Sequence, residues 1–192
     1  MVIFNKMISS LVPYFPKSLT YQFAKRYVAG TTKETALKAI KKLNESGYLV
    51  TLDILGEHTK NKDVAADITA QSIELYREID SRSLSCNISL KPTHIGSEIS
   101  TDTYNNNLQK IITISEATNN FVRIDMESSK HTDFTINSFL EQRKNNLQIG
   151  TVFQAYLYRT YDDVTALDPE NLNFRLCKGI YKESDDVCIN DR

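Results

Sequence analysis

Hydrophobic residues along the chain occur in two alternating patterns, helical spacing and short apolar runs. The first helical stretch begins at Thr31, which forms a capping-box pattern with Glu34, and it ends at Gly47. Its apolar positions are Ala36, Leu37, Ile40 and Leu43. The spacing of these residues predicts an amphipathic helix over residues 31–47.

Five apolar runs follow, and stretches of helical spacing separate them. We expect strands at residues 48–55, 84–91, 121–127, 149–157 and 174–181, with helices around residues 64–79, 103–117, 134–140 and 162–167. Neighbouring parallel strands need a crossover connection, and a helix supplies it. The order predicts an α/β domain over residues 31–192, preceded by an N-terminal helical arm over residues 1–30.

A polar residue stands at or just beyond the end of every predicted strand. These residues are Glu57, Lys91, Asp125, Gln154 and Lys178. Barrel enzymes collect catalytic groups at the carboxyl ends of all their strands, whereas an open doubly wound sheet concentrates them at one crevice. The pattern favours an incomplete (β/α)8 TIM-type barrel of about five βα units.

Composition narrows the class of protein. The 192 residues are 41% hydrophobic and 24% charged, with a net charge of −1, so no basic excess indicates nucleic-acid binding. Three cysteines, Cys86, Cys177 and Cys188, without CxxC spacing are typical of a reducing compartment. Lys6 and two prolines interrupt the apolar N-terminal stretch, so we expect no transmembrane helix there, while peripheral membrane contact stays open.

Several common site motifs are absent from the sequence. It contains no G-x-G-x-x-G, no G-x-x-x-x-G-K-[ST] and no G-x-S-x-G, although Lys178 and Gly179 form a weak candidate for holding a phosphate. His58, His94 and His131 lack metal-ligand spacing, so we expect them to lie at the surface or to support site residues, and we expect no metal site.

Lys91 and Asp125 each place a charge at the end of an apolar strand, in ISLK and VRID. Such a charge must be paired, solvated or bound to a ligand, because isolated burial is costly. Two interpretations stay open: a structural ion pair, or a site in which Lys91 holds an anionic substrate beside a carboxylate. Arg175 and Glu57 allow the same two interpretations.

Five strings together resemble the proline dehydrogenase family, in its monofunctional, FAD-dependent type. They are LDILGE (52–57), ISLKPTHIG (88–96), FVRIDMESS (121–129), FQAYLYRT (153–160) and RLCKGIYKE (175–183). They follow the family order and cover roughly residues 27–183. The resemblance implies a distorted (β/α)8 barrel that binds FAD, oxidises L-proline to 1-pyrroline-5-carboxylate and passes electrons to a membrane quinone.

The resemblance also implies roles for individual residues. Lys91 would bind the substrate carboxylate, and Asp125 would be the catalytic carboxylate below the flavin. Glu57 would pair with Arg175 and gate the substrate pocket. The residues expected to contact FAD are Met126, Gln154, Arg175, Lys178, Gly179 and Ile180, with Arg175 also catalytic. The expected location is cytoplasmic, peripheral on the inner face of the cell membrane.

One family element is missing from the sequence. The family closes its substrate site with Tyr-x-x-Arg-Arg, and this chain has no Arg-Arg pair. Its 192 residues are also fewer than the ~250 of a typical closed barrel. We therefore expect a C-terminally truncated piece, or a chain whose partner supplies the rest. The competing hypotheses are a catalytically inactive barrel fragment and a lyase or aldolase that uses Lys91 as a Schiff base.

Overall fold

The computed structural model describes residues 28–146, 148–169 and 172–190. Its contacts divide the chain into two compact units, Met1–Tyr48 and Leu49–Arg192. No helix in these described ranges is both long enough and apolar enough to cross a bilayer. The N-terminal stretch, for which peripheral membrane contact is left open, and most of the arm predicted over residues 1–30 lie outside the described residues.

The first unit contains the helix α3 (Lys33–Glu45), in which Leu37 and Ile40 are buried as predicted. Its N-cap is Thr32, and the sequence-based assignment of Thr31 with Glu34 is wrong. The hydroxyl of Thr35 accepts from the backbone N–H of Thr32 at 3.2 Å, and the Thr32 hydroxyl accepts from the Thr35 N–H at 3.3 Å. The capping box is therefore built one residue later, from two threonines.

The second unit is built on a five-stranded parallel sheet in which the strands lie in sequence order. The strands are β1 (Val50–Asp53), β2 (Cys86–Leu90), β3 (Val122–Ile124), β4 (Ile149–Gln154) and β5 (Phe174–Cys177). Sequential parallel order confirms the predicted α/β class, and it is the order of a barrel sheet.

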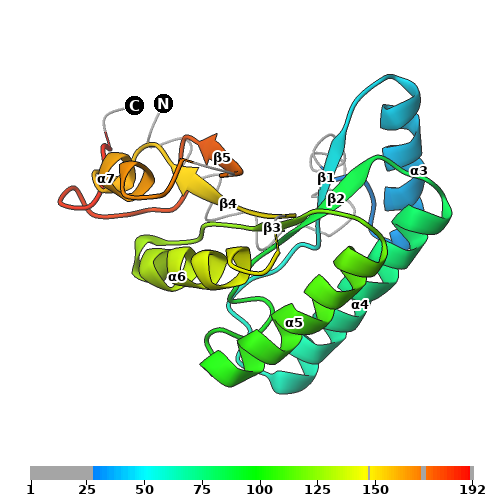
Figure 1. Cartoon of the computed structure of the whole chain (residues 1–192), viewed down its shortest axis with the longest axis horizontal. Helices are drawn as coiled ribbons and strands as arrows, with labels where there is room; N and C mark the ends of the chain where they lie inside the picture. The colour runs from blue at the N-terminus through cyan, green and yellow to red at the C-terminus, as the bar shows by residue number, and fades with distance from the viewer. Residues whose placement is uncertain (1–27, 147, 170–171, 191–192) are drawn as a thin grey trace, which may run out of the picture. The chain divides into compact units, whose positions relative to one another are not determined.

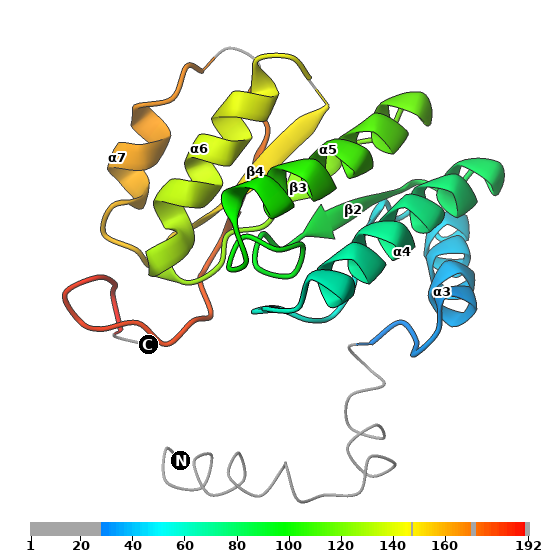
Figure 2. The ribbon, with the colours of Figure 1, turned by 90° about the horizontal axis from the view of Figure 1, so that it is seen from below.

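Helices connect the strands, and α4, α5 and α6 lie on one side of the curved sheet (Figures 1 and 2). The connections contain α4 (Lys62–Ser81), α5 (Thr101–Ala117), the short 3-10 helix η2 (Ser129–His131) with α6 (Thr132–Arg143), and α7 (Thr160–Thr165). A doubly wound sheet would have helices on both faces. Covering one face leaves the other as the inner surface of a partial barrel.

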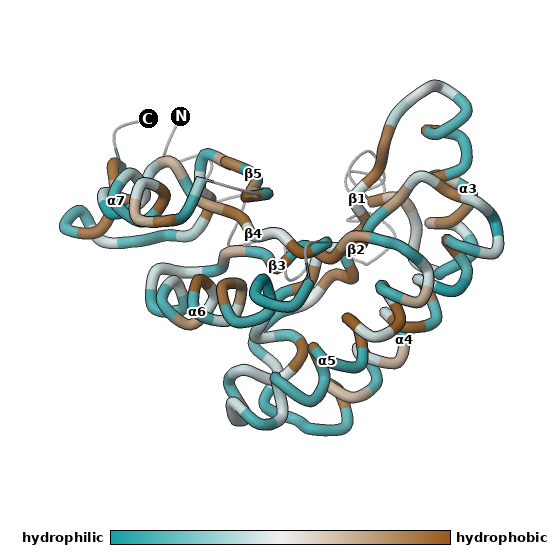
Figure 3. Tube along the Cα trace, in the orientation of Figure 1, coloured by the Kyte–Doolittle hydropathy of each residue, from teal (hydrophilic) through white to brown (hydrophobic). Residues whose placement is uncertain are grey.

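The two faces of the sheet differ in chemistry because successive residues of a strand point to opposite sides. The helix-facing positions of β2 and β3 are buried and apolar: Ile88, Leu90, Val122 and Ile124. Hydrophobic colour accordingly gathers along the central strands in Figure 3. The opposite face carries polar and charged residues, among them Asp53, Ser89 and Arg123. The polar face is where the candidate site lies.

The strands are shorter than the apolar runs predicted. The run over residues 121–127 yields only Val122–Ile124, and the run over 149–157 ends at Gln154, where Leu157 N–H turns back to the Gln154 carbonyl at 3.1 Å. The last run, predicted to reach residue 181, stops at Cys177, two residues before Gly179 with its positive φ of 107°. In each case the remaining residues of the run form the loop that shapes the carboxyl edge.

Candidate functional site at the carboxyl edge of the sheet

Three charged side chains named from the sequence meet at the carboxyl edge. Lys91 follows β2, Asp125 follows β3, and Arg175 lies within β5. Arg175 Nη2 donates to Asp125 Oδ1 at 2.8 Å, and Lys91 Nζ lies 3.9 Å from Asp125 Oδ2. Lys91 and Asp125 meet because β2 and β3 are parallel neighbours. Asp125 and Arg175, 50 positions apart, meet across the intervening strand β4.

Asp53, which sequence reasoning did not single out, is the closer partner of Lys91. Lys91 Nζ donates to Asp53 Oδ2, and the hydroxyl of Ser89 donates to Asp125. The signal was present, because Asp53 is the one charged residue in the apolar run YLVTLDIL (48–55), and Asp125 likewise carries a charge at the end of an apolar run. Lys91 therefore stands between two carboxylates, and both of its side-chain contacts are to anions.

The electrostatics of this cluster are nearly balanced. Two cations, Lys91 and Arg175, face two carboxylates, Asp53 and Asp125. Burial raises the pKa of Asp53 above its ordinary value, although the Lys91 ammonium acts against the increase. Burial together with the nearby Arg175 lowers the pKa of Arg123, whose guanidinium donates to the Thr151 carbonyl at 2.9 Å.

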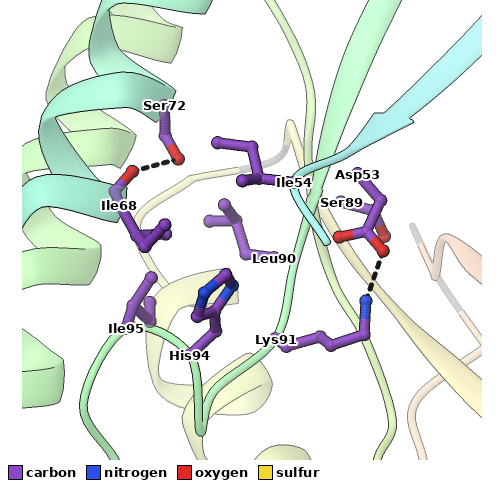
Figure 4. Close-up of a pocket in the computed structure, with 9 residues that line it drawn as sticks. All are labelled: Asp53, Ile54, Ile68, Ser72, Ser89, Leu90, Lys91, His94 and Ile95. Atoms are coloured by element: carbon purple, nitrogen blue, oxygen red, sulfur yellow. Dashed lines mark hydrogen bonds and ion pairs between the residues drawn. The ribbon is translucent and has the colours of Figure 1, made fainter. Parts of the chain in front are cut away.

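A cavity beside this cluster lies between β1, β2 and α4 (Figure 4). Asp53, Lys91 and the buried ring of His94 form part of its wall. Burial lowers the pKa of His94, which indicates a neutral imidazole. The space accommodates about one water molecule, so it is an extension of the charged cluster and too small for a substrate by itself.

A second, buried network braces the same edge. Glu127 is fully buried; its carboxylate accepts from the backbone N–H of Thr93 at 2.9 Å and from the Thr93 hydroxyl. Burial raises the pKa of Glu127. Its carbonyl accepts from Gln154 Nε2 at 2.6 Å. The loops after β2 and β3 are thereby tied to the end of β4.

The predicted gate residues have other partners in this structure. Glu57 accepts from the hydroxyl of Tyr181 at 2.8 Å, while Arg175 binds Asp125. No hydrogen bond or ion pair within the described ranges joins Glu57 to Arg175. The gating role of the pair stays a prediction. Burial and the neighbouring Glu57 raise the pKa of Tyr181.

The residues expected to contact FAD occupy different environments. Met126 and Gln154 are buried, and Lys178 and Ile180 are exposed, Ile180 to 83%. The amide oxygen Oε1 of Gln154 is buried and has no hydrogen-bond partner among the described residues. An unpaired buried acceptor is costly unless a ligand donates to it. A ring N–H such as that of a flavin is a suitable donor, so this residue fits the cofactor.

Gly179 has a simpler explanation than ligand contact. A Cβ atom at this position would lie 2.1 Å from a ring carbon of Tyr156. The glycine therefore allows the loop after β5 to pass over the tyrosine ring, and this packing alone requires it. A role in holding FAD stays a prediction.

The histidines are not grouped in sequence, yet two of them meet in space. His58 and His131 approach the carboxylate of Glu98 from different loops, at 3.2 and 3.4 Å, whereas His94 lies in the cavity beside Lys91. Spacing along the chain gave no sign of this group, because its members come from three separate connections.

Comparison with known proteins gives one consistent family. The family described as proline dehydrogenase matches residues 36–188. Proline dehydrogenase 1 of Bacillus subtilis (strain 168) is 35% identical over 169 residues, which cover 88% of this chain and 56% of that protein. Proline dehydrogenase of Deinococcus radiodurans is 29% identical, over 90% of this chain and 57% of the relative. The chain thus spans little more than half the length of these relatives.

Solved structures agree with this assignment. Proline utilization A from Bdellovibrio bacteriovorus, inactivated by N-propargylglycine, superimposes with a TM-score of 0.74 and 26% identity, over 81% of this chain and 20% of that one. The protein of the same name from Corynebacterium freiburgense gives a TM-score of 0.67 at 19% identity, over 91% of this chain and 20% of that one, and supports the fold alone. By sequence match and by fold, the chain belongs to the proline dehydrogenase family.

Proposed function

We propose that this chain supplies the βα units carrying the core of the active site of an FAD-dependent enzyme. That enzyme oxidises L-proline to 1-pyrroline-5-carboxylate and passes the electrons to a membrane quinone. One observation carries the proposal: Lys91, Asp125 and Arg175 meet at the carboxyl edge of the sheet. Membership in the family supports the oxidation of proline as the reaction.

Proline carries a carboxylate and a secondary amine, and the cluster offers a partner for each. Lys91 is the cation for the substrate carboxylate, and Asp125 is an acceptor for the amine. In the absence of substrate, Asp53 and Asp125 hold the Lys91 ammonium in place. A bound carboxylate competes with them for the same donor, so the ion pairs position Lys91 for its ligand.

The amine must lose its proton before a hydride can leave the neighbouring carbon. Lys91 and Asp125 act on the amine in opposite directions, since a nearby cation lowers its pKa and a nearby anion raises it. Arg175 offsets part of the charge of Asp125 through its 2.8 Å contact. Arg175 therefore has an electrostatic role in addition to its proposed contact with the cofactor.

Gln154, Met126 and the segment Lys178–Gly179–Ile180 are the proposed cofactor-binding residues. When bound, FAD would supply the acceptor for two electrons and a proton. The unpaired Oε1 of Gln154 offers a hydrogen-bond acceptor, and exposed Lys178 offers positive charge for a phosphate. Glu57 is proposed to gate the substrate pocket with Arg175. A cytoplasmic location, peripheral on the inner membrane face, follows from the proposed quinone acceptor.

The visible spectrum of the purified chain, saturated with FAD, tests this function. Bleaching of the flavin band under anaerobic conditions on addition of L-proline supports it, and a colourless chain that takes up no FAD contradicts it for the chain alone. Lys91→Ala is expected to weaken proline binding more than FAD binding. Lys144→Ala, which removes an exposed lysine paired with Glu141, is the matched control.

A second candidate is a catalytically inactive half-barrel. Leu176 in β5 is 58% exposed and Ile180 is 83% exposed, which favours association over catalysis by the isolated chain. A colourless and aggregating preparation supports this candidate. The lyase hypothesis is disfavoured, because the contacts of Lys91 with two carboxylates are those of an ammonium ion and a Schiff-base lysine reacts as the free amine. Borohydride trapping of a Lys91 adduct would reverse that conclusion.

A further inference from the structure

Three loops at the carboxyl edge bring together two imidazoles and a carboxylate that the proposed reaction does not use. His58 follows β1, Glu98 precedes α5, and His131 ends η2. One ligand atom from each residue lies within 4.8 Å of the other two. Glu98 Oε1 is central, at 3.2 Å from His58 Nδ1 and 3.4 Å from His131 Nε2.

These two separations match the distance between two ligand atoms that are bound to the same metal ion. Ligands held about 2.0–2.1 Å from a tetrahedral zinc ion lie about 3.3 Å from one another. The two ring centroids are 6.0 Å apart and tilted by 39°, so the imidazoles are not stacked and a third group can lie between them. Two histidines and a glutamate form a ligand set that zinc accepts with further positions left for water.

One ring nitrogen of His131 lacks a hydrogen-bond partner among the described residues. Its Nε2 is buried and makes no hydrogen bond within the described part of the chain, although Glu98 is near. The 3.4 Å separation brings the two atoms together without the alignment of a hydrogen bond. A buried imidazole nitrogen in this position gains a partner if a cation enters.

The backbone conformation of His58 is fixed by a hydrogen bond to a neighbouring loop. Its φ is +57°, in the left-handed region that residues with a side chain rarely adopt. The N–H of His58 donates to the Thr93 hydroxyl at 2.8 Å, which fixes this conformation. On the far side of the ring, His58 Nε2 lies 4.0 Å from Glu57 Oε1. Carboxylates in that position commonly orient metal-binding histidines.

Lys130 is the competing cation. Its Nζ lies 3.3 Å from Glu98 Oε1, but its side chain is 63% exposed, whereas Glu98 is only 15% exposed. An exposed lysine can turn into solvent at little cost, since surface ion pairs contribute little to stability. The carboxylate is thus fixed between the histidines while its lysine partner is replaceable.

We propose that His58, Glu98 and His131 bind one zinc ion, which ties together the loops after β1, β2 and β3. The histidines supply neutral nitrogen ligands and Glu98 supplies the anionic oxygen. The ion would lie next to Glu57, at the rim of the candidate active site, and would stabilise the three loops that form this rim. A hard, oxygen-seeking ion such as Mg²⁺ is not expected to bind two imidazoles.

Titration of the untagged, chelator-treated chain with Zn²⁺ tests the site. We expect saturable uptake of one equivalent, a higher melting temperature and no response to Mg²⁺. Co²⁺ in place of zinc should give the visible absorption bands of a four- or five-coordinate ion. Absence of saturable zinc uptake, or equal uptake of Mg²⁺, overturns the proposal.

Paired variants separate this site from general surface binding. Glu98→Gln and His131→Ala should weaken zinc binding at least about tenfold, whereas Glu141→Gln, at an exposed carboxylate on α6, should leave it unchanged. Lys130→Ala should tighten binding about fivefold by removing the competing cation, and Lys144→Ala should have no effect. Circular dichroism establishes that each variant is folded. Zinc affinity that is the same in folded Glu98→Gln and Lys130→Ala as in the original chain contradicts the assignment.

Discussion

At the scale of single residues, the carboxyl edge contains two carboxylates that differ in their hydrogen-bond partners and in their burial. Asp125 receives a hydroxyl from Ser89 and a guanidinium from Arg175, so cationic and neutral donors share its charge. Glu127, two residues later, is fully buried, and both of its carboxylate partners come from Thr93. Asp125 thus belongs to the candidate site, whereas Glu127, also beyond the end of β3, belongs to the buried network that supports the site.

Glu127 gives the chain a measurable pH dependence of stability. Burial raises the pKa of its carboxyl above the ordinary value of 4.5, so the folded state binds this proton more tightly than the unfolded state does. The stabilisation is fully present below pH 4.5 and is lost as the pH rises through the raised pKa. We expect Glu127→Gln to remove this contribution, so that its unfolding free energy changes less than that of the original chain between pH 7.5 and 4.5.

Urea denaturation at a series of pH values measures this difference. Glu141→Gln, at an exposed carboxylate paired with Lys144, is the control and should follow the original chain. A constant difference in unfolding free energy between Glu127→Gln and the original chain, at every pH, would show that burial does not perturb this carboxyl.

Sequence reasoning identified the charges that interrupt apolar runs and missed those whose importance depends on partners. Lys91 and Asp125 stand out because each ends an apolar strand. The role of Asp53 depends on which strand lies beside β1, and the burial of Glu127 depends on a loop 34 residues away. Contacts between distant loops produce no periodic pattern in the sequence. The meeting of His58 and His131 could therefore not be predicted from the sequence either.

At the scale of elements, helices α5 and α6 are joined by a buried polar contact. The hydroxyl of Tyr104 on α5 lies 2.7 Å from the hydroxyl of Ser138 on α6. The Tyr104 ring also meets Phe134 edge-on, with 4.9 Å between ring centroids. Tyr104 is fully buried, so its hydroxyl depends on Ser138 as a partner.

A double-mutant cycle measures this contact. Tyr104→Phe alone leaves Ser138 without its partner, and Ser138→Ala alone leaves the buried phenol unpaired, so each should lower the unfolding free energy by about 1–2 kcal/mol. The double variant should lose less than the sum, with a coupling of about 1 kcal/mol. Strict additivity of the two single effects would show that the hydroxyls do not interact.

Two glycines end elements for different reasons. Gly47 follows α3 with φ at +85° and has open space where a side chain would go. Gly179 follows β5 with φ at +107°, and a Cβ there would enter the ring of Tyr156. Gly47→Ala should cost about 1 kcal/mol of unfolding free energy, from backbone strain alone. Gly179→Ala should cost at least about 2 kcal/mol more, because strain and overlap add.

Thermal unfolding of the two variants under identical conditions compares these costs. Equal losses would mean that the loop after β5 shifts freely away from Tyr156, and the packing of that loop would then not depend on glycine. The sequence predicted turns at both positions, since glycine is common at element ends. It gave no information on the tyrosine ring, which belongs to the preceding connection.

At the scale of the whole molecule, the parallel sheet of the second unit has β1 and β5 as its outermost strands. Helices flank the middle of the sheet, and β4, the neighbour of β5, is buried at every position. β5 is exposed at three of its four positions. The barrel class could be predicted from the alternation of apolar runs and helices along the sequence. The exposure of β5 could not, because it depends on which elements lie beside this strand in space.

An exposed apolar strand with unpaired backbone groups favours association with another sheet edge. Leu176, on β5, is 58% exposed, and burying such a side chain is worth about 1.5–3 kcal/mol. We expect the purified chain to self-associate as its concentration rises. Leu176→Glu should shift this association to at least about tenfold higher concentration, because the charge opposes burial of the strand.

Tyr161→Glu, at a 75% exposed position on α7, is the matched control and should leave association unchanged. Sedimentation velocity over a concentration series distinguishes these outcomes, and equal effects of the two variants would indicate that net charge, not the edge of β5, controls association.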